Sequence, residues 1–233
     1  MKFLMLILAG LLACTGIIAQ NACPEMHERK SNTRIHEQNS FGIRMAYNNT
    51  RATNISEIAK VSSLNRFQIG VFHTFYLPKN WFLKTDLIYN QKGNFYNDDD
   101  PIADGGKKVS IRLNYIEASI EAGYGIKIRG VHSIRIGFGP YLAYGINGTE
   151  KGSAETLYGR IGIDKKIEIV NTQTKEGTNL KIKPVDAGLN FIIAYQYQKY
   201  GMFVNYGLGL VNRENWGEAL NRVASVGVSY SFR

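Results

Sequence analysis

The residue types that most often carry enzymatic chemistry are scattered through this sequence. The four histidines are His27, His36, His73 and His132: two in a polar N-terminal stretch, one in a strand-like segment and one in a short turn. A catalytic centre needs a nucleophile, a base and an orienting group that converge in one place. No Ser, His and Asp set does so, and we therefore expect no enzymatic activity and no catalytic residues.

The sequence motifs that could bind a metal ion or a cofactor are also incomplete. The acidic run Asp98 to Asp100, with Asp104, offers oxygen ligands for Ca²⁺, but its spacing lacks the Gly and the terminal Glu of an EF-hand loop. Gly207 and Gly209 are too little for a phosphate-binding loop, and glycines within a strand more often relieve crowding. We expect a solvated acidic loop, no metal and no cofactor.

A different set of charged residues recurs at alternate positions within segments that read as strands. Its members are Arg44, Lys84, Asp86, Lys92, Arg112, Glu117, Glu121, Arg135 and Asp186. Five positive and four negative groups nearly cancel, as side chains that share a buried space must. What such a set could do depends on the elements that hold it.

The last stretch of the chain shows what those elements are. From Arg222 onward, Val226, Val228, Tyr230 and Phe232 fall on one face of an extended strand, and small, mostly hydroxylated residues fall on the other. This pattern is typical of the closing strand of a membrane β-barrel, whose apolar face contacts lipid.

The same alternation predicts eight strands in all. They are residues 41–48, 66–77, 81–93, 109–126, 133–147, 184–197, 202–210 and 222–233. The connections alternate between long and short, with short turns at 77–80, 129–132 and 198–201, as in outer-membrane barrels. We predict an all-β fold: an eight-stranded antiparallel up-and-down transmembrane barrel with short periplasmic turns and long extracellular loops.

The barrel gives the charged set a role. The interior of an eight-stranded barrel is just wide enough for side chains to fill it, so we expect the nine residues to form an ionic network that plugs the lumen. A narrow gated conduit is the alternative. In the fourth strand the apolar set changes phase, and we expect a β-bulge at Tyr115 or Ile116 that keeps both apolar sets outside and turns Glu117 and Glu121 inward.

The N-terminal sequence predicts that the protein is exported from the cytoplasm. Lys2 is followed by an apolar run and the chain turns polar at Gln20, which indicates a secretory signal peptide at residues 1–19. A lipoprotein signal ending at Cys14 is the alternative. Residues 20–39 then form a periplasmic tail and residues 40–233 the barrel domain, with the C-terminus also periplasmic. The formal charge of +9 is scattered, not clustered with aromatics, which argues against nucleic-acid binding.

Several short segments together resemble a known family. They are Leu83 to Gly93, Asn114 to Glu117, Gly137 to Tyr141, Val185 to Leu189, Gly207 to Leu210 and Tyr230 to Phe232. In this order they resemble the PorT-like outer-membrane β-barrel family of Bacteroidetes-type bacteria, although Ser119 stands where proline is expected. The resemblance implies an eight-stranded barrel without catalytic residues, and a role similar to that of accessory factors for protein secretion.

These inferences give one functional expectation and two alternatives. We expect a non-enzymatic structural or accessory component of the outer membrane. Its expected partners are lipid and lipopolysaccharide, the barrel-assembly machinery during insertion, and other envelope or secretion proteins. A surface adhesin or ligand-binding barrel acting through the long loops is the first alternative. A soluble calycin-like carrier, with apolar residues inside and charges outside, is the second.

Overall fold

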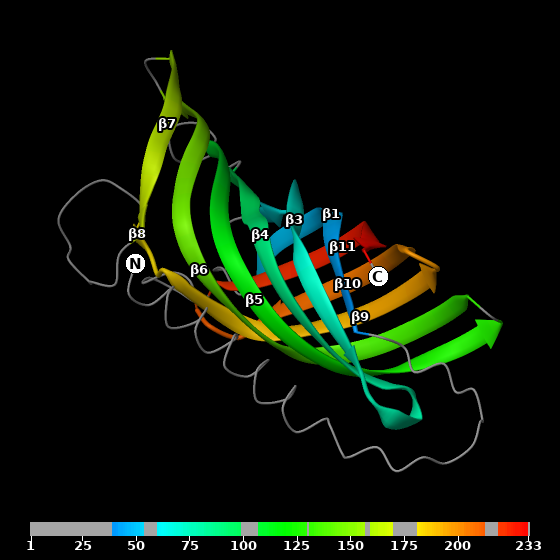
Figure 1. The fold of residues 1–233 in the computed structure, drawn as a ribbon. Coiled ribbons are helices and arrows are strands. Elements are labelled where there is room, and N and C mark those ends of the chain that lie inside the picture. Colours follow the sequence, from blue (N-terminus) through cyan, green and yellow to red (C-terminus); the bar gives the residue numbers. More distant parts are fainter. Residues whose placement is uncertain are drawn as a thin grey trace, which may run out of the picture. The chain divides into compact units, whose positions relative to one another are not determined.

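A closed ring of eight antiparallel strands dominates the computed structural model, which describes residues 39–53, 60–98, 107–129, 131–156, 159–169, 181–212 and 219–232 (Figure 1). In ring order the strands are β1 (Ser40–Thr53), β3 (Leu64–Tyr76), β4 (Trp81–Asp98), β5 (Lys107–Arg129), β6 (His132–Thr156), β9 (Val185–Tyr197), β10 (Tyr200–Gly209) and β11 (Leu220–Ser231). β11 pairs with β10 on one side and β1 on the other, which closes the ring. The predicted eight-stranded barrel is confirmed.

The two ends of the barrel differ in their connections. At one end, here called the turn end, β3 and β4 are joined through residues 77–80 and the 3₁₀ turn η1 (Pro78–Asn80), and β9 and β10 through residues 198–199. Lys79 and Asn80 have φ of 60° and 65°, so the chain reverses within these two residues. β5 and β6 are joined at the same end by residues 130–131. The opposite end, the loop end, carries the longer connections, so the predicted alternation is confirmed.

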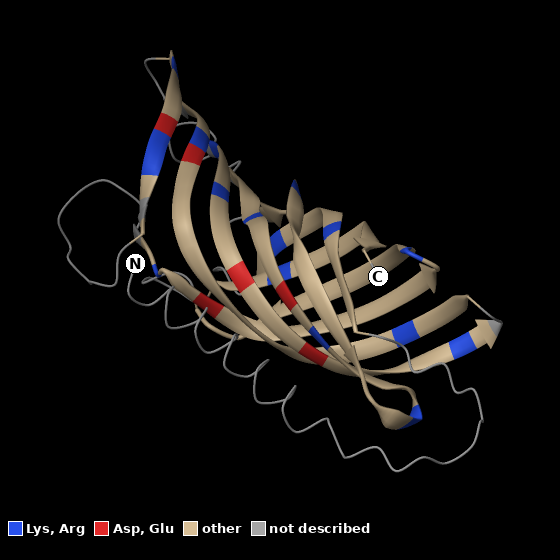
Figure 2. Ribbon diagram, viewed as in Figure 1, with Lys and Arg blue, Asp and Glu red and all other residues tan. Residues whose placement is uncertain are grey.

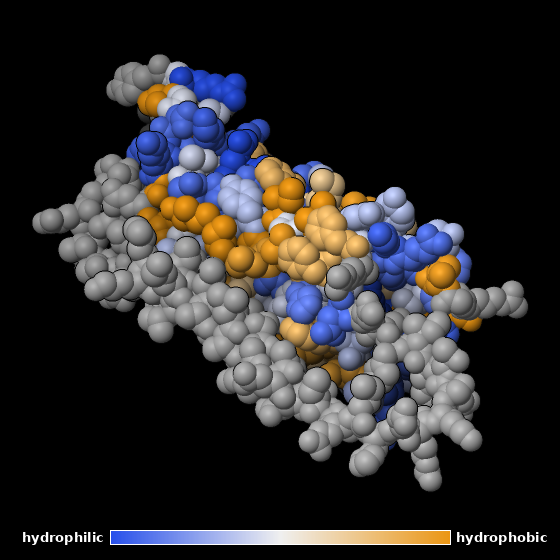
Figure 3. Space-filling model, viewed as in Figure 1, coloured by the Kyte–Doolittle hydropathy of each residue, from blue (hydrophilic) through white to orange (hydrophobic). Residues whose placement is uncertain are grey.

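The wall of the barrel is apolar on the outside. Along β1, Phe41, Ile43, Met45 and Tyr47 are exposed, and the residues between them are buried. On the face shown in Figure 3, hydrophobic residues gather across the middle of the barrel, and hydrophilic residues lie around β7 (Gly159–Ile169). Val226, Val228 and Phe232 of the closing strand are exposed on the same outer wall, and Tyr230 is half-buried.

Aromatic side chains gather on the outer wall at the turn end. Trp81 packs on Tyr124 with ring centroids 5.7 Å apart, and Phe41 on Phe232 at 5.6 Å. Tyr200 and Tyr230 are 5.4 Å apart. Such rings of aromatics mark the interface between the apolar core of a membrane and water.

At the loop end the barrel extends beyond the eight-stranded ring. β7 forms a hairpin with the last third of β6, and β8 (Lys181–Ile182) pairs with the end of β7. β2 (Lys60–Ser62) pairs with β4 at Phe95 to Asn97. β7 is the second arm of this hairpin and is drawn at the upper left of Figure 1.

β5 lacks the predicted bulge, and the prediction that both of its apolar sets lie outside is wrong, although Glu117 and Glu121 do lie inside the barrel. β5 pairs with β4 without interruption, and the register shift lies in β6, where Asn114 faces Asn147 while Tyr115 faces Gly145. Because β5 has no bulge, its odd-numbered residues Val109 to Tyr115 lie inside the barrel and not outside. The apolar residues of this regular strand switch from odd-numbered to even-numbered positions because the surroundings of the strand change along its length.

Two predictions on the N-terminal part fall outside the described residues, namely the signal peptide at 1–19 and the tail up to residue 38. Within the part of the chain that the structure describes, no helix has the length and apolar character needed to cross a membrane.

Candidate functional site in the barrel interior

Eight of the nine charged residues predicted for the lumen lie inside the barrel. They are Arg44, Lys84, Asp86, Lys92, Glu117, Glu121, Arg135 and Asp186. Arg112 is the exception, because on the regular strand β5 it alternates with the inward-facing Ile111 and Leu113 and is exposed on the outer face. Figure 2 shows the Lys and Arg positions in blue and the Asp and Glu positions in red along the ribbons of the wall. The eight interior residues comprise four cations and four anions.

The lower group of charges lies nearer the turn end and joins three strands. Arg44 Nη1 of β1 donates to Asp86 Oδ1 of β4 at 2.8 Å, and Lys84 Nζ contacts the other oxygen of Asp86. Lys84 also reaches Glu121 Oε2 of β5 at 3.3 Å. Two cations and two anions meet here, so the group is neutral as a whole.

The upper group lies nearer the loop end and is centred on one lysine. Lys92 Nζ is 2.7 Å from Glu117 Oε2 and 2.9 Å from Asp186 Oδ2, which ties β4 to β5 and β9. Its ammonium also lies 4.3 Å from the ring centroid of Tyr141, within the range of a cation–π contact. Lys92 is 1% exposed.

Amide and hydroxyl groups complete the upper group. Asn90 donates to Glu117 at 2.9 Å and Asn221 to Asp186 at 2.9 Å, while Asn48 donates to Asn90 at 2.9 Å. Tyr141 Oη lies 3.4 Å from both oxygens of Asp186. Buried carboxylates are tolerated when their lone pairs are satisfied in this way. These partners were missed from the sequence, although Asn48, Asn90 and Asn221 do occupy inward positions of their strands.

An apolar cluster closes the interior above the upper group. It consists of Val109, Ile111, Leu113, Tyr115, Tyr141, Ala143, Ile167 and Ile182. Ile167 belongs to β7 and Ile182 to β8, so the extension beyond the ring packs onto the same cluster. Here the barrel has an apolar interior and a polar outer face, which is the pattern of a β structure in water. This explains why Arg112 faces outward.

Two of the four histidines lie among the described residues. His73 lies in β3, and His132 lies at the turn end against Tyr195, with His132 Nδ1 2.6 Å from Tyr195 Oη. His27 and His36 fall outside the described residues, as do most of the acidic run at 98–104. Among the residues that the structure describes, no three His, Cys, Asp or Glu side chains are grouped so as to hold a metal ion.

What the interior can do is fill and brace the barrel. Charged groups point inward and large apolar side chains point outward, which is the reverse of the calycin-like alternative. The cross-strand ion pairs link β1, β4, β5 and β9 through the lumen. A closed antiparallel barrel with a polar interior and an apolar wall bounded by aromatics defines the class of β-barrel membrane proteins.

Comparison with known proteins identifies the family within this class. Residues 24–213 match the model of the outer membrane protein beta-barrel domain, and the chain belongs to this family. A search of curated proteins finds no match to the sequence.

Several solved structures are similar at low sequence identity. Neisserial surface protein A is 14% identical with a TM-score of 0.43, over 84% of this chain and 100% of that one. Ail, the attachment invasion locus protein of Yersinia pestis, is 12% identical with a TM-score of 0.40, over 84% of this chain and 99% of that one. The N-terminal barrel domain of Pseudomonas aeruginosa OprF is 11% identical with a TM-score of 0.30, over 84% and 100%.

Proposed function

We propose that this protein is a non-enzymatic structural or accessory component of the bacterial outer membrane, and that it acts through surfaces outside its lumen. The observation that carries this proposal is the filled interior. Lys92 bridges Glu117 and Asp186, an apolar cluster closes the space above them, and the ion pairs of Arg44 and Lys84 lie below. A barrel filled in this way has no open path for solutes.

Conductance tests the sealed interior directly. The protein reconstituted into planar lipid bilayers should show no large, regular single-channel steps. Steady steps of the size given by open porins would contradict the proposal, and would favour the gated conduit.

The proposal includes an orientation. The turn end and the residue 20–39 tail face the periplasm after removal of a signal peptide at 1–19, and the loop end faces the exterior. Support comes from the general rule that outer-membrane barrels have short periplasmic turns and longer extracellular loops. In a Cys23→Ser background, Ile161→Cys of β7 should react with an impermeant maleimide on intact cells. Lys79→Cys should react only after the outer membrane is permeabilised, and the opposite pattern would invert the orientation.

A link to protein secretion is the finer part of the proposal. It rests on the resemblance of segments such as Leu83 to Gly93 to the PorT-like family, and on the absence of an evident lumen activity among the described residues. The proposed partners are outer-membrane lipid and lipopolysaccharide, the barrel-assembly machinery during insertion, and other envelope proteins. Affinity purification of the tagged protein from native membranes in mild detergent should retain secretion subunits in stoichiometric amount. A barrel that is recovered alone would refute the secretion link and leave the structural role.

A surface-binding role is the second candidate, and the β6–β7 hairpin favours it. This hairpin extends past the ring and exposes charged residues of both signs, among them Lys151 and Asp164, which form an ion pair at 3.0 Å. Replacing residues 151–164 by a two-residue Asn-Gly turn removes the tip but keeps Ile167 in the apolar cluster. Attachment of cells to host or matrix surfaces should then fall, and unchanged attachment would remove this candidate.

A further inference from the structure

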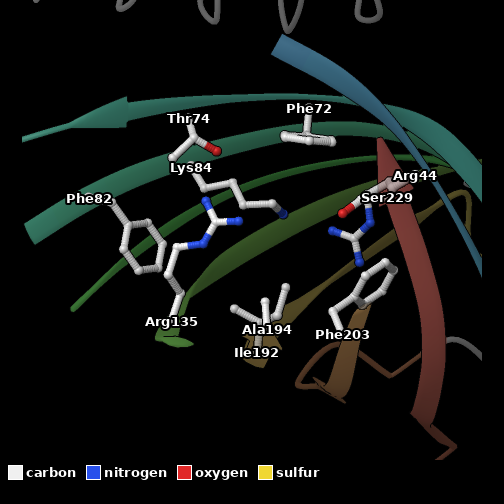
Figure 4. Close-up of a pocket in the computed structure, with 10 residues that line it drawn as sticks. All are labelled: Arg44, Phe72, Thr74, Phe82, Lys84, Arg135, Ile192, Ala194, Phe203 and Ser229. Atoms are coloured by element: carbon white, nitrogen blue, oxygen red, sulfur yellow. The ribbon is translucent and has the colours of Figure 1, made fainter. Parts of the chain in front are cut away.

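The cations inside the barrel already have partners there. Figure 4 shows the side chains of Arg44, Lys84 and Arg135 in the interior. Arg44 and Lys84 form ion pairs with Asp86, and Arg135 donates hydrogen bonds to two neutral side chains. A second group of cations lies on the outer face of the barrel at the loop end, and its surroundings are different.

Five cations lie on the outer face of β5, β6 and β7 near the loop end. Arg112 of β5 faces Thr149 of β6, which in turn faces Lys166 of β7. Two strand spacings of about 4.8 Å each separate Arg112 from Lys166, so these two long side chains can meet at one anionic group. The five cations are Lys108, Arg112, Lys151, Arg160 and Lys166, and each of them is exposed.

Negative charge is scarce on this outer face. Among the side chains that the structure describes there, Asp164 is the one carboxylate, and it pairs with Lys151 at 3.0 Å. Glu150 faces the buried Ile111 across the β5–β6 pair, so it lies on the inner side of the sheet. Five positive charges and one negative charge leave the described outer face strongly cationic.

Small hydroxylated residues lie between these cations. Ser110 and Thr149 occupy outward positions of β5 and β6, and Ser153 Oγ accepts from Arg160 Nη2 at 3.0 Å. The Ser110 hydroxyl is buried and has no hydrogen-bond partner among the described residues, and a group of this kind calls for an explanation. Hydroxyl donors set among Arg and Lys suit a phosphate, which offers several strong acceptor oxygens.

Two further arginines lie at the loop end of the seam between β1 and β11. Arg51 is directly opposite Arg222, and both alternate with buried residues, so both lie on the outer face. Like charges directly opposite each other destabilise a sheet. Arg222 Nη1 donates to the carbonyl of Gly209 at 2.8 Å, and none of the described carboxylates forms an ion pair with either arginine. An anion bound between them would relieve their repulsion.

These cations begin where the apolar wall ends. Along β1, Arg51 lies four residues beyond Tyr47, an exposed aromatic residue of the wall. Along β5, Arg112 lies four residues beyond the outward-facing Ile116. Four residues of strand span about 13 Å. The arginines therefore lie just beyond the lipid-facing wall, in the layer that the lipid head groups occupy.

We propose that a cationic belt, made of Arg51, Arg222, Arg112, Lys151 and Lys166, binds the phosphate groups of lipid A in lipopolysaccharide. The inference rests on the orientation proposed above, in which the loop end faces the exterior. Lipid A is the component of the outer leaflet that places phosphates at the head-group layer, directly beside its acyl chains. Its chains would lie against the apolar wall while its phosphates meet the belt.

The test uses diphosphoryl lipid A as probe and the full mature chain refolded in zwitterionic detergent, so that no native lipid is carried over. Native mass spectrometry should show saturable binding of lipid A. Dephosphorylated lipid A, which has the same acyl chains, should bind at least tenfold more weakly. Phosphatidylglycerol should also bind at least tenfold more weakly, and inorganic phosphate at the concentration of the lipid should not displace lipid A.

Three double variants separate the belt from a general attraction of anions. Arg112→Gln with Lys166→Gln should weaken lipid A binding at least fivefold, and Arg51→Gln with Arg222→Gln should do the same. The matched control is Lys79→Gln with Lys199→Gln, which removes two exposed lysines from the turn end and should leave binding unchanged. The heat-dependent gel shift of each variant checks that the barrel is folded.

Three results would overturn the proposal. Equal binding of dephosphorylated lipid A would show that the acyl chains alone are recognised, and equal binding of phosphatidylglycerol that any anionic lipid is accepted. An equal loss of binding in the turn-end control would show that only the total charge matters. Binding in micelles does not depend on how the barrel is inserted, so inverted maleimide labelling with intact lipid A binding would refute the proposed orientation alone.

Discussion

Replacing Lys92 by Met should be among the most destabilising single changes in this barrel. The ammonium of Lys92 is 2.7 Å from Glu117 and 2.9 Å from Asp186, and it is 1% exposed. Removing it leaves two buried carboxylates without their cation. Breaking a buried ion pair by removing one partner costs about 3–5 kcal/mol, and we expect a loss of this size in the free energy of unfolding.

The assay is reversible unfolding by denaturant in the presence of lipid vesicles, followed by tryptophan fluorescence. The matched control is Lys151→Met, which removes a lysine from the exposed pair with Asp164, whose side chains are 49% and 70% exposed. Exposed pairs contribute about 0–1 kcal/mol, so this control should change little.

A triple variant tests the cause of the loss. Lys92→Met combined with Glu117→Gln and Asp186→Asn removes all three charges and keeps the shape of the group. It should recover most of the stability, because no uncompensated charge remains. The reasoning is refuted if Lys92→Met alone costs less than about 1 kcal/mol, or if the triple variant is no more stable than the single one.

Three further predictions follow from the wall and the lumen. Gly139→Ala places a methyl group against the backbone of β5 at Ile120 and should cost about 1–3 kcal/mol in the same unfolding assay, whereas Gly162→Ala in β7 meets open space and should be neutral. Val228→Arg puts a charge on the apolar outer wall and should cost about 2–4 kcal/mol, while Ile161→Arg, at a residue that is also exposed but lies on the hairpin, should have little effect; equal losses would mean that the wall does not contact lipid. Arg135→Ala should widen the turn end without producing large single-channel steps in planar bilayers, because the groups centred on Lys92 and Asp86 remain; such steps would show that Arg135 is the seal.

The alternation of the strands was sufficient to predict the architecture, because a membrane barrel repeats one pattern of period two in every strand. Phe41, Ile43 and Met45 are apolar since lipid surrounds them, and Arg44 is tolerated since the lumen provides Asp86. Strand number, short turns and eight interior charges all follow from that single rule.

The prediction failed where the surroundings of the strand change. Val109 to Tyr115 are apolar because they pack inside the loop-end extension, and Arg112 is charged because its face meets water there. A pattern of apolar and polar positions cannot by itself tell a lipid-facing set from a core-facing one. The switch of the apolar residues from odd-numbered positions up to Tyr115 to even-numbered positions from Ile116 marks the point where the surroundings change. Interpreting this switch as a bulge missed that change.

The interior partners were harder to predict for a different reason. The pairing of Lys92 with Asp186, 94 residues away, depends on barrel closure and on the tilt of the strands. Asn and Tyr residues at inward positions could equally well have served only to fill space.

The pairing of the first strand with the last has a consequence for how the protein is made. β1 faces β11 along its length, and Thr53 and Leu220, which meet in this pair, are 167 residues apart. The seam can form only after the whole chain has been synthesised and exported, and contacts of such long range form slowly. Until then β1 and β10 each have an unpaired edge beside an apolar face, which is the combination that promotes aggregation. Truncations of β11 leave these edges unpaired for good, and such truncated chains should be lost to proteolysis before insertion and not accumulate as open barrels.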